Sequence, residues 1–155
     1  MARHLSEETS IPWTEVDTLT WDPGWVEVPV ETQRDRIQAI CAQDEWILDS
    51  AYGKWLEIPL ERVELIIGLD YPRWRSLRQL LWRTVSRSVT KEKVCNGNVE
   101  SLRGMFSRDS IIGWHFKPFA RKRERVYQWA KDPRWTVVIL RHPRELDAWL
   151  AEVRG

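Results

Sequence analysis

A chain of 155 residues that is 43% hydrophobic and 30% charged has the composition of one globular domain with a sizeable core. It holds no run of about 18 apolar residues, so neither a membrane span nor a membrane partner is expected. The basic-then-apolar pattern of an export signal is also missing. Cys41 and Cys95 are too few and too far apart for a disulfide framework or a zinc site. We therefore expect reduced thiols in a cytoplasmic protein.

Charge is unevenly distributed along the chain, although the formal total is only +1. Residues 1–72 carry 5 basic and 15 acidic side chains, whereas residues 73–125 carry 14 basic and 4 acidic ones. The strongly basic segment is either a solvated face or a site for a concentrated anion, such as a nucleotide polyphosphate or nucleic acid. The 11 tryptophans are scattered singly, which favours packing over a platform for stacked bases.

Hydrophobic spacing and breaker residues predict alternating helices and strands in the first half of the chain. The first helix ends near Thr9 because Pro12 forbids its continuation. The predicted elements are a helix over the first residues that lapses at Thr9, a strand over 13–16, a turn over 22–25, a helix over 32–42 and a buried strand over 45–49. Ile37, Ile40 and Cys41 share one face of the second helix.

The second half continues the same alternation. The predicted elements are a strand over 63–70, a helix over 73–89, short helices over 90–117, a basic helix over 117–131, a strand over 136–140 and a helix over 144–153. The apolar run over 63–70 is typical of a parallel strand covered on both faces. Apolar stripes on the helices are predicted to face inward: Trp74, Leu77, Leu81 and Val85, then Leu146, Trp149, Leu150 and Val153. Strands separated by helices predict a doubly wound α/β domain.

In such folds function lies beyond the carboxyl ends of the strands. These ends carry Asp17, Asp49, Asp70 and the pair Arg141-His142. Carboxylates there could help to hold Mg²⁺ or a substrate hydroxyl, although each acid could equally be a turn or cap residue.

Two arginines of the predicted 73–89 helix, Arg83 and Arg87, lie one turn apart on a single face. Their guanidinium groups repel each other unless an anion or an acid lies between them. This pair is a stronger sequence signal for a functional site than the acids at the strand ends.

Several strings resemble the adenylate kinase-related family of P-loop proteins, in particular its topology modulation protein branch. They are WILDSAYG, GLDYPRWRSLRQLLWRTVSRSVTKEKVCNGNVESL, FSRDSIIGW, KDPRW and VVILRHPRELDAWL. The resemblance runs from about Ala2 to Val153. It implies one domain over 1–155 with a doubly wound parallel sheet of the P-loop nucleoside/nucleotide kinase type and a helical lid inserted at about 90–117.

The chain departs from that family at its beginning. Family members start with a strand and a Gly-x-x-x-x-Gly-Lys-Ser/Thr loop, which runs into a helix resembling ARHLSEE, and no Gly-Lys-Ser/Thr occurs in this sequence. Without the loop there is no cradle of backbone N–H groups for phosphate. In the family the missing strand lies between those matching EWILD and VELIIGL, so two strand edges should face a gap. We expect an N-terminally truncated chain that binds ATP poorly and is weak or inactive.

The resemblance implies a role for individual residues. Asp49 resembles the acid that holds the water shell of Mg²⁺, and Asp17 and Tyr52 flank the acceptor pocket. Asn96, Gly97 and Asn98 would form the turn on which the lid pivots and contribute to substrate binding. The lid arginines that neutralise transition-state charge would be Arg83, Arg87, Arg103 and Arg108.

Three functions remain open at this stage. The first is a kinase-like enzyme that uses ATP and Mg²⁺ and acts on a nucleotide or another phosphate-bearing small molecule. The second is a catalytically dead pseudo-kinase that binds a partner through the basic region over 73–125. The third is a DNA-associated protein that uses Lys117–Arg125 with nearby aromatic side chains.

Overall fold

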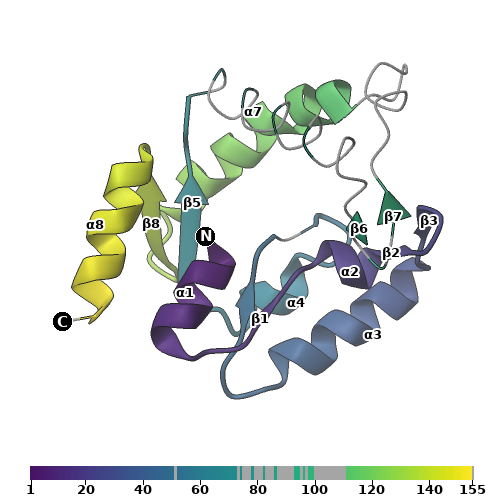
Figure 1. Ribbon diagram of the computed structural model, residues 1–155. Helices are drawn as coiled ribbons and strands as arrows, with labels where there is room; N and C mark the ends of the chain where they lie inside the picture. Colours follow the sequence, from purple (N-terminus) through teal and green to yellow (C-terminus); the bar gives the residue numbers. More distant parts are fainter. Residues whose placement is uncertain are drawn as a thin grey trace. The chain divides into compact units, whose positions relative to one another are not determined.

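The computed structural model describes residues 1–50, 52–72 and 111–154, together with residues 74, 78, 82, 86, 93, 94, 96, 98 and 99. Figure 1 traces its elements along the chain. They belong to two compact units, one comprising residues 1–63, 95–98 and 148–155 and the other residues 64–94 and 99–147. Each unit contains one parallel pair of strands, so the fold class is mixed α/β.

The first unit is built from short elements. They are α1 (Ala2–Thr9), β1 (Trp13–Thr14), α2 (Asp17–Thr20), β2 (Trp21–Asp22), β3 (Val26–Glu27), α3 (Val30–Cys41), β4 (Ile47–Leu48) and α4 (Glu57–Leu60). The predicted end of α1 near Thr9 is confirmed. The helix closes at Ser10, which adopts a left-handed conformation with φ 63° and donates its N–H to Ser6 O at 2.8 Å.

β1 and β4 form the parallel pair of this unit, with Trp13 opposite Ile47 and Thr14 opposite Leu48. Both strands are shorter than predicted. β1 stops early because Val16 already has helical φ and ψ and begins the turn of α2. The strand predicted to be buried, β4, is only half-buried.

β2 and β3 form an antiparallel hairpin that confirms the predicted turn at Asp22–Trp25. Gly24 and Trp25 both have positive φ, 81° and 58°. Such values suit glycine but are unusual for a side chain as large as that of tryptophan. The hairpin therefore holds Trp25 in a conformation that its side chain does not favour.

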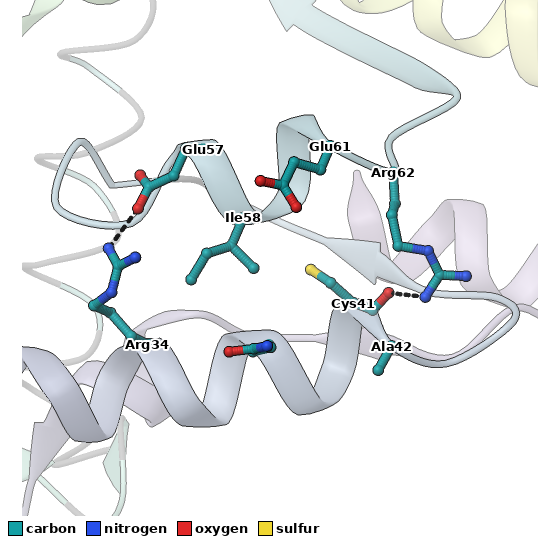
Figure 2. A pocket seen from close by; sticks show the side chains of 8 residues that line it. Arg34, Cys41, Ala42, Glu57, Ile58, Glu61 and Arg62 are labelled. Carbon is teal, nitrogen blue, oxygen red and sulfur yellow. Dashed lines mark hydrogen bonds and ion pairs between the residues drawn. The ribbon is translucent and has the colours of Figure 1, made fainter.

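α3 and α4 border a groove of about 360 Å³ (Figure 2). Arg34 pairs with Glu57 at 2.5 Å on its rim, and Arg62 donates to the carbonyl oxygen of Cys41 at 2.5 Å. Burial raises the pKa of the Cys41 thiol, so the thiol stays protonated and behaves as an apolar core group.

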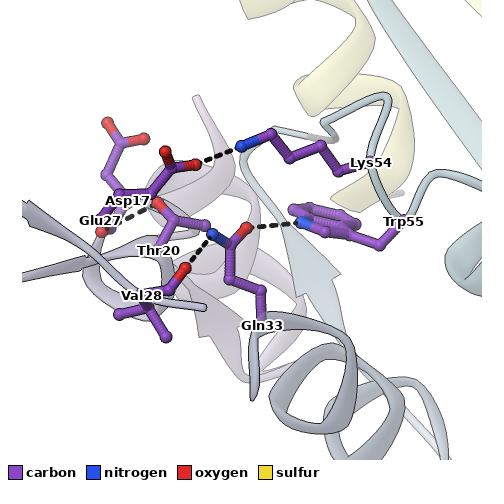
Figure 3. A network of polar contacts seen from close by, with 7 residues as sticks. All are labelled: Asp17, Thr20, Glu27, Val28, Gln33, Lys54 and Trp55. Atoms are coloured by element: carbon purple, nitrogen blue, oxygen red, sulfur yellow. Dashed lines mark hydrogen bonds and ion pairs between the residues drawn. The ribbon is translucent and has the colours of Figure 1, made fainter. Parts of the chain in front are cut away.

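The core of the first unit consists of Val16, Ile37, Cys41 and Trp55. A buried glutamine, Gln33, crosses it (Figure 3): its Nε2 donates to Val28 O at 2.7 Å, and Trp55 Nε1 donates to Gln33 Oε1 at 3.1 Å. Trp55 and Ile37 are completely buried. Gln33 thus satisfies the indole N–H and a backbone carbonyl that would otherwise be buried without partners.

The second unit is centred on β5 (Leu65–Leu69) and β8 (Thr136–Leu140), which pair in parallel from Leu65 opposite Thr136 to Leu69 opposite Leu140. The bounds of β8 are those predicted. α7 (Ile111–Trp129) packs against this pair, since Val126 lies directly over Gly68. α8 (Pro143–Arg154) follows β8 as predicted.

Some predictions for this half of the chain are wrong. β6 (Lys93–Val94) and β7 (Asn98–Val99) form a two-stranded sheet where only short helices were expected, and α7 begins at residue 111 rather than 117. Leu65 and Leu69 are 37% and 45% exposed, because α7 covers the face of β5 that carries Gly68 and these leucines lie on the other face.

Two side chains predicted to face inward are exposed. Trp74 is 65% exposed and Val153 is 46% exposed, whereas Leu150 of the same stripe on α8 is buried. Most of the predicted 73–89 helix lies outside the described residues, although Trp74, Arg78, Trp82 and Ser86 are helical.

The parallel pairs are two separate two-stranded sheets. Among the described strands, β4 is hydrogen-bonded to β1 alone and β5 to β8 alone. None of the described helices is both long and apolar enough to cross a bilayer.

Gly68 should tolerate no side chain, because a Cβ at this position would overlap Val126 Cγ1. We expect Gly68→Ala to lower the free energy of unfolding by about 1–3 kcal/mol, measured by urea denaturation. The matched control is Gly53→Ala, whose Cβ would meet no atom within 4 Å. Adding Val126→Ala should restore most of the loss. Equal stability of the two glycine variants would contradict this packing.

Candidate functional site

Three of the predicted site residues meet at the carboxyl end of the β1–β4 pair. Asp17 opens α2 just after β1, and Asp49 directly follows β4, so parallel pairing brings both acids to one edge. The hydroxyl of Tyr52 donates a hydrogen bond to Asp17 Oδ1. The backbone N–H of Val16 donates to Asp49 Oδ1 at 3.0 Å. Both carboxylates are thus held in fixed orientations.

The two acids also interact electrostatically. Asp49 is exposed, yet the protein atoms around its carboxyl desolvate it and raise its pKa above the ordinary aspartate value. The hydrogen bond from Val16 lowers this pKa, and the nearby charge of Asp17 raises it. A cation between the two carboxylates would offset the cost of desolvating the Asp49 carboxylate. It would also reduce the repulsion between Asp49 and Asp17.

Asn96, the first residue of the predicted Asn-Gly-Asn turn, bonds to α2, the helix that Asp17 opens. Its Nδ2 donates to Thr18 O and to Trp21 O, each at 2.8 Å, and so bonds to both ends of α2. Asn96 has φ 61°, the left-handed conformation that asparagine tolerates in turns. Asn98 lies in β7, and Gly97 is outside the described residues. Asp17, Asp49 and Tyr52 form one cluster, called the acidic cluster below, and Asn96 bonds to the helix that Asp17 opens.

The acidic cluster could bind a hydrated cation, but not a metal ion through a full set of side chains. No group of three or more His, Cys, Asp and Glu side chains among the described residues could hold a metal directly. A single carboxylate such as Asp49 fits the water shell of Mg²⁺, which keeps several of its waters in most protein sites.

The four predicted lid arginines, Arg83, Arg87, Arg103 and Arg108, all lie outside the described residues. Their proposed contacts with phosphate therefore remain predictions. Among the predicted site residues that the structure describes, none lines the groove between α3 and α4.

A second polar cluster occupies the carboxyl end of the β5–β8 pair. Asp70 follows β5 and accepts two bonds from Arg123, at 2.8 and 3.0 Å, and one from the Tyr127 hydroxyl at 2.7 Å. Tyr127 and Asp70 both raise the pKa of Arg141, Tyr127 the more strongly. The sequence pointed to Asp70 and Arg141 but missed Arg123 and Tyr127, whose i, i+4 spacing on a helix was the available signal.

Comparisons with protein-family models, with curated proteins and with solved structures find no match to this chain. The resemblance to adenylate kinase-related proteins therefore stays a prediction from the sequence, and the candidate function depends on the geometry of the acidic cluster.

The raised pKa of Asp49 predicts a specific dependence of stability on pH. A carboxyl with a raised folded-state pKa favours folding below its unfolded pKa and loses that contribution as pH rises through the folded value. Asp49→Asn keeps an oxygen for the Val16 N–H and removes the charge. We expect it to melt slightly above the wild type at pH 7, with the difference shrinking towards pH 3.5.

Asp132→Asn is the control, for which we expect the opposite change in melting temperature at pH 7. Hydrogen bonds from Arg134 lower the pKa of Asp132, so this variant should melt below the wild type at pH 7 and approach it as pH falls. Melting temperatures between pH 3.5 and 7 test both expectations. An Asp49→Asn variant that is less stable at pH 7 would show that its carboxylate favours the folded state.

Proposed function

We propose that this chain is a kinase-like phosphotransferase domain of the adenylate kinase-related type, which transfers phosphate from ATP to a hydroxyl or phosphate group of a small molecule. The observation that carries the proposal is the convergence of Asp17, Asp49 and Tyr52 at the carboxyl end of a parallel strand pair. This is the position at which α/β folds bind their ligands.

The residues of the acidic cluster suit distinct tasks in such a reaction. Asp17, held by the Tyr52 hydroxyl, can accept a hydrogen bond from an acceptor hydroxyl and orient it. Asp49, whose Oδ1 accepts the Val16 N–H, would orient a water of hydrated Mg²⁺. When bound, Mg²⁺ neutralises charge on the phosphates. Asn96 fastens the turn that leads to the predicted lid onto α2, beside the acceptor side of the site.

The finer fold belongs to the same proposal. β1–β4 and β5–β8 would be the two sides of one doubly wound sheet. The parallel sense of both pairs supports this arrangement. The expected cytoplasmic location also remains part of the proposal, because ATP is supplied there.

The residues fit hydrated Mg²⁺ better than they fit a triphosphate. The sequence contains no Gly-Lys-Ser/Thr, so it offers no P-loop to enclose the phosphates. We therefore expect weak but saturable binding of ATP with Mg²⁺, with a dissociation constant above about 10 μM, equivalent to less than about 7 kcal/mol. Isothermal titration measures it. A dissociation constant below that value would show that a P-loop is not needed for tight ATP binding. Absence of binding at millimolar ATP would favour the catalytically dead pseudo-kinase over the enzyme.

Nucleic-acid binding is the second candidate, favoured by α7. Its residues Arg121, Lys122 and Arg123 are consecutive and exposed. If they bind a phosphate backbone, the logarithm of the affinity for DNA should fall linearly with the logarithm of salt concentration. Arg121→Gln should reduce this slope by about 1. Affinity for DNA that is independent of salt would exclude this candidate.

A further inference from the structure

Two tryptophans and an arginine line one side of the helical segment that follows Pro72. Trp74, Arg78 and Trp82 are all helical and are spaced four residues apart, so their side chains project from one side on successive turns. Trp74 is 65% exposed and Trp82 is 74% exposed, and Arg78 is exposed as well. These three residues are called the tryptophan–arginine row below.

Packing does not account for the tryptophan–arginine row. Although the scattered tryptophans of the sequence favour packing, these two lie mostly in solvent, whereas Trp129 and Trp135 pack against each other with ring centroids 6.2 Å apart. In the described part of the chain, none of the three side chains of the row forms an ion pair, a hydrogen bond or a ring contact. Neighbouring exposed tryptophans mark an interaction surface.

The charge of this segment selects an anionic ligand. Residues 73–89 contain five arginines and neither an acid nor a lysine, so no carboxylate of the same segment neutralises them. Such a concentration of positive charge attracts a polyanion. The polyanions that also have a place for exposed tryptophan rings are a nucleic acid and an anionic lipid surface.

The order of the side chains favours nucleic acid over lipid. A helix that lies in a lipid surface keeps its cations and its apolar side chains on separate faces. Arg78 instead lies between the two tryptophans on the same side. Four residues of helix rise about 6 Å, close to twice the spacing of about 3.4 Å between successive bases. A base can therefore stack between two neighbouring planar side chains of the row.

We propose that the tryptophan–arginine row is a binding surface for single-stranded nucleic acid. Indole rings and a guanidinium plane stack on the faces of bases, which are accessible in a single strand and covered in a duplex. The other arginines of residues 73–89 add attraction to the phosphate backbone, which does not depend on base sequence. The inference depends neither on phosphoryl transfer nor on the basic run of α7, because it uses other residues.

The test measures binding of a fluorescein-labelled oligothymidylate to the full chain by fluorescence anisotropy. Its matched control is an abasic oligomer of the same length, which carries the same phosphates but no bases. We expect the oligothymidylate to bind at least tenfold more tightly than the abasic oligomer, because only the former can stack on the indole rings. Equal binding of the two would overturn the inference and leave phosphate binding alone, as α7 could provide.

Two substitutions of Trp82 separate stacking from apolar contact. Trp82→Leu keeps an apolar side chain but removes the ring, and should weaken binding of the oligothymidylate at least fivefold. Trp82→Phe keeps a ring and should retain most of the affinity. Both variants should melt as the wild type does, because Trp82 is 74% exposed. If Trp82→Leu melts lower, Trp74→Leu and Trp74→Phe repeat the comparison.

Val153→Ala is the control for the loss of an exposed apolar side chain outside the row, and it should leave binding unchanged. Equal affinities of the leucine and phenylalanine variants, or an equal loss in Val153→Ala, would overturn the inference. Binding to vesicles that contain phosphatidylserine, with none to the oligothymidylate, would also overturn it, in favour of a lipid surface.

Discussion

Replacing Trp55 with alanine should lower the free energy of unfolding by about 3–5 kcal/mol. Trp55 is completely buried among Val16, Ile37 and Cys41, so truncation leaves a large cavity. It also removes the N–H that bonds Gln33 Oε1. Because a domain of this kind has a total stability of about 5–15 kcal/mol, much of the protein should be unfolded in mild urea.

The urea transition of this variant measures the effect, with Trp74→Ala as control. Trp74 is 65% exposed, so its truncation should change stability by no more than about 0.5 kcal/mol. Trp55→Phe separates the effect of lost side-chain volume from that of the lost hydrogen bond. We expect its free energy of unfolding still to fall by about 1–3 kcal/mol, because Gln33 Oε1 is left without its donor. Similar losses in Trp55→Ala and Trp74→Ala would refute this description of the core.

Replacing Arg87 with lysine should lower kcat/KM for phosphoryl transfer or ATP hydrolysis at least about tenfold, roughly 1.4 kcal/mol. Lysine keeps the charge but loses the planar group that binds phosphate through two nitrogens. Arg87 lies outside the described residues, so this expectation comes from its spacing to Arg83 and from the family resemblance. Steady-state kinetics and a melting curve together are the measurement.

The matched control is Arg121→Lys, an exposed position on α7 whose exchange should leave the kinetics unchanged. Unchanged kinetics in Arg87→Lys, or a large drop in its melting temperature, would assign Arg87 to the scaffold instead of the site. An equal effect at both positions would indicate a general dependence on positive charge.

Local signals were sufficient to predict several elements. α1 has a breaker shortly after its end, β8 is a pure run of β-branched and aliphatic residues, and the Pro-Gly pair fixes the hairpin turn. Each of these depends on residues that are neighbours in sequence. Asp17 and Asp49 could be expected at one edge for a similar reason, since each follows a strand.

Features that depend on contacts distant in sequence could not be predicted. The bonds of Gln33 to Val28 and Trp55, and those of Asp70 to Arg123 and Tyr127, join residues whose side chains alone reveal no partner. The exposure of Leu65 and Leu69 depends on which face of β5 is covered by α7. An apolar run shows only that a strand prefers burial, and not which of its faces is buried.

The most direct test of the proposed function is to follow ATP with Mg²⁺ by phosphorus NMR in the presence of high concentrations of the chain and a mixture of nucleosides, nucleotides and sugars. We predict slow loss of the γ-phosphate with formation of a new phosphorylated product. Asp17→Asn should reduce this rate at least tenfold, because the acceptor loses the carboxylate that orients it. Asp132→Asn, at an acid that is not part of the acidic cluster, should not change the rate. No phosphorylated product from the wild type, or equal rates in all three proteins, would contradict a phosphotransferase site at Asp17, Asp49 and Tyr52.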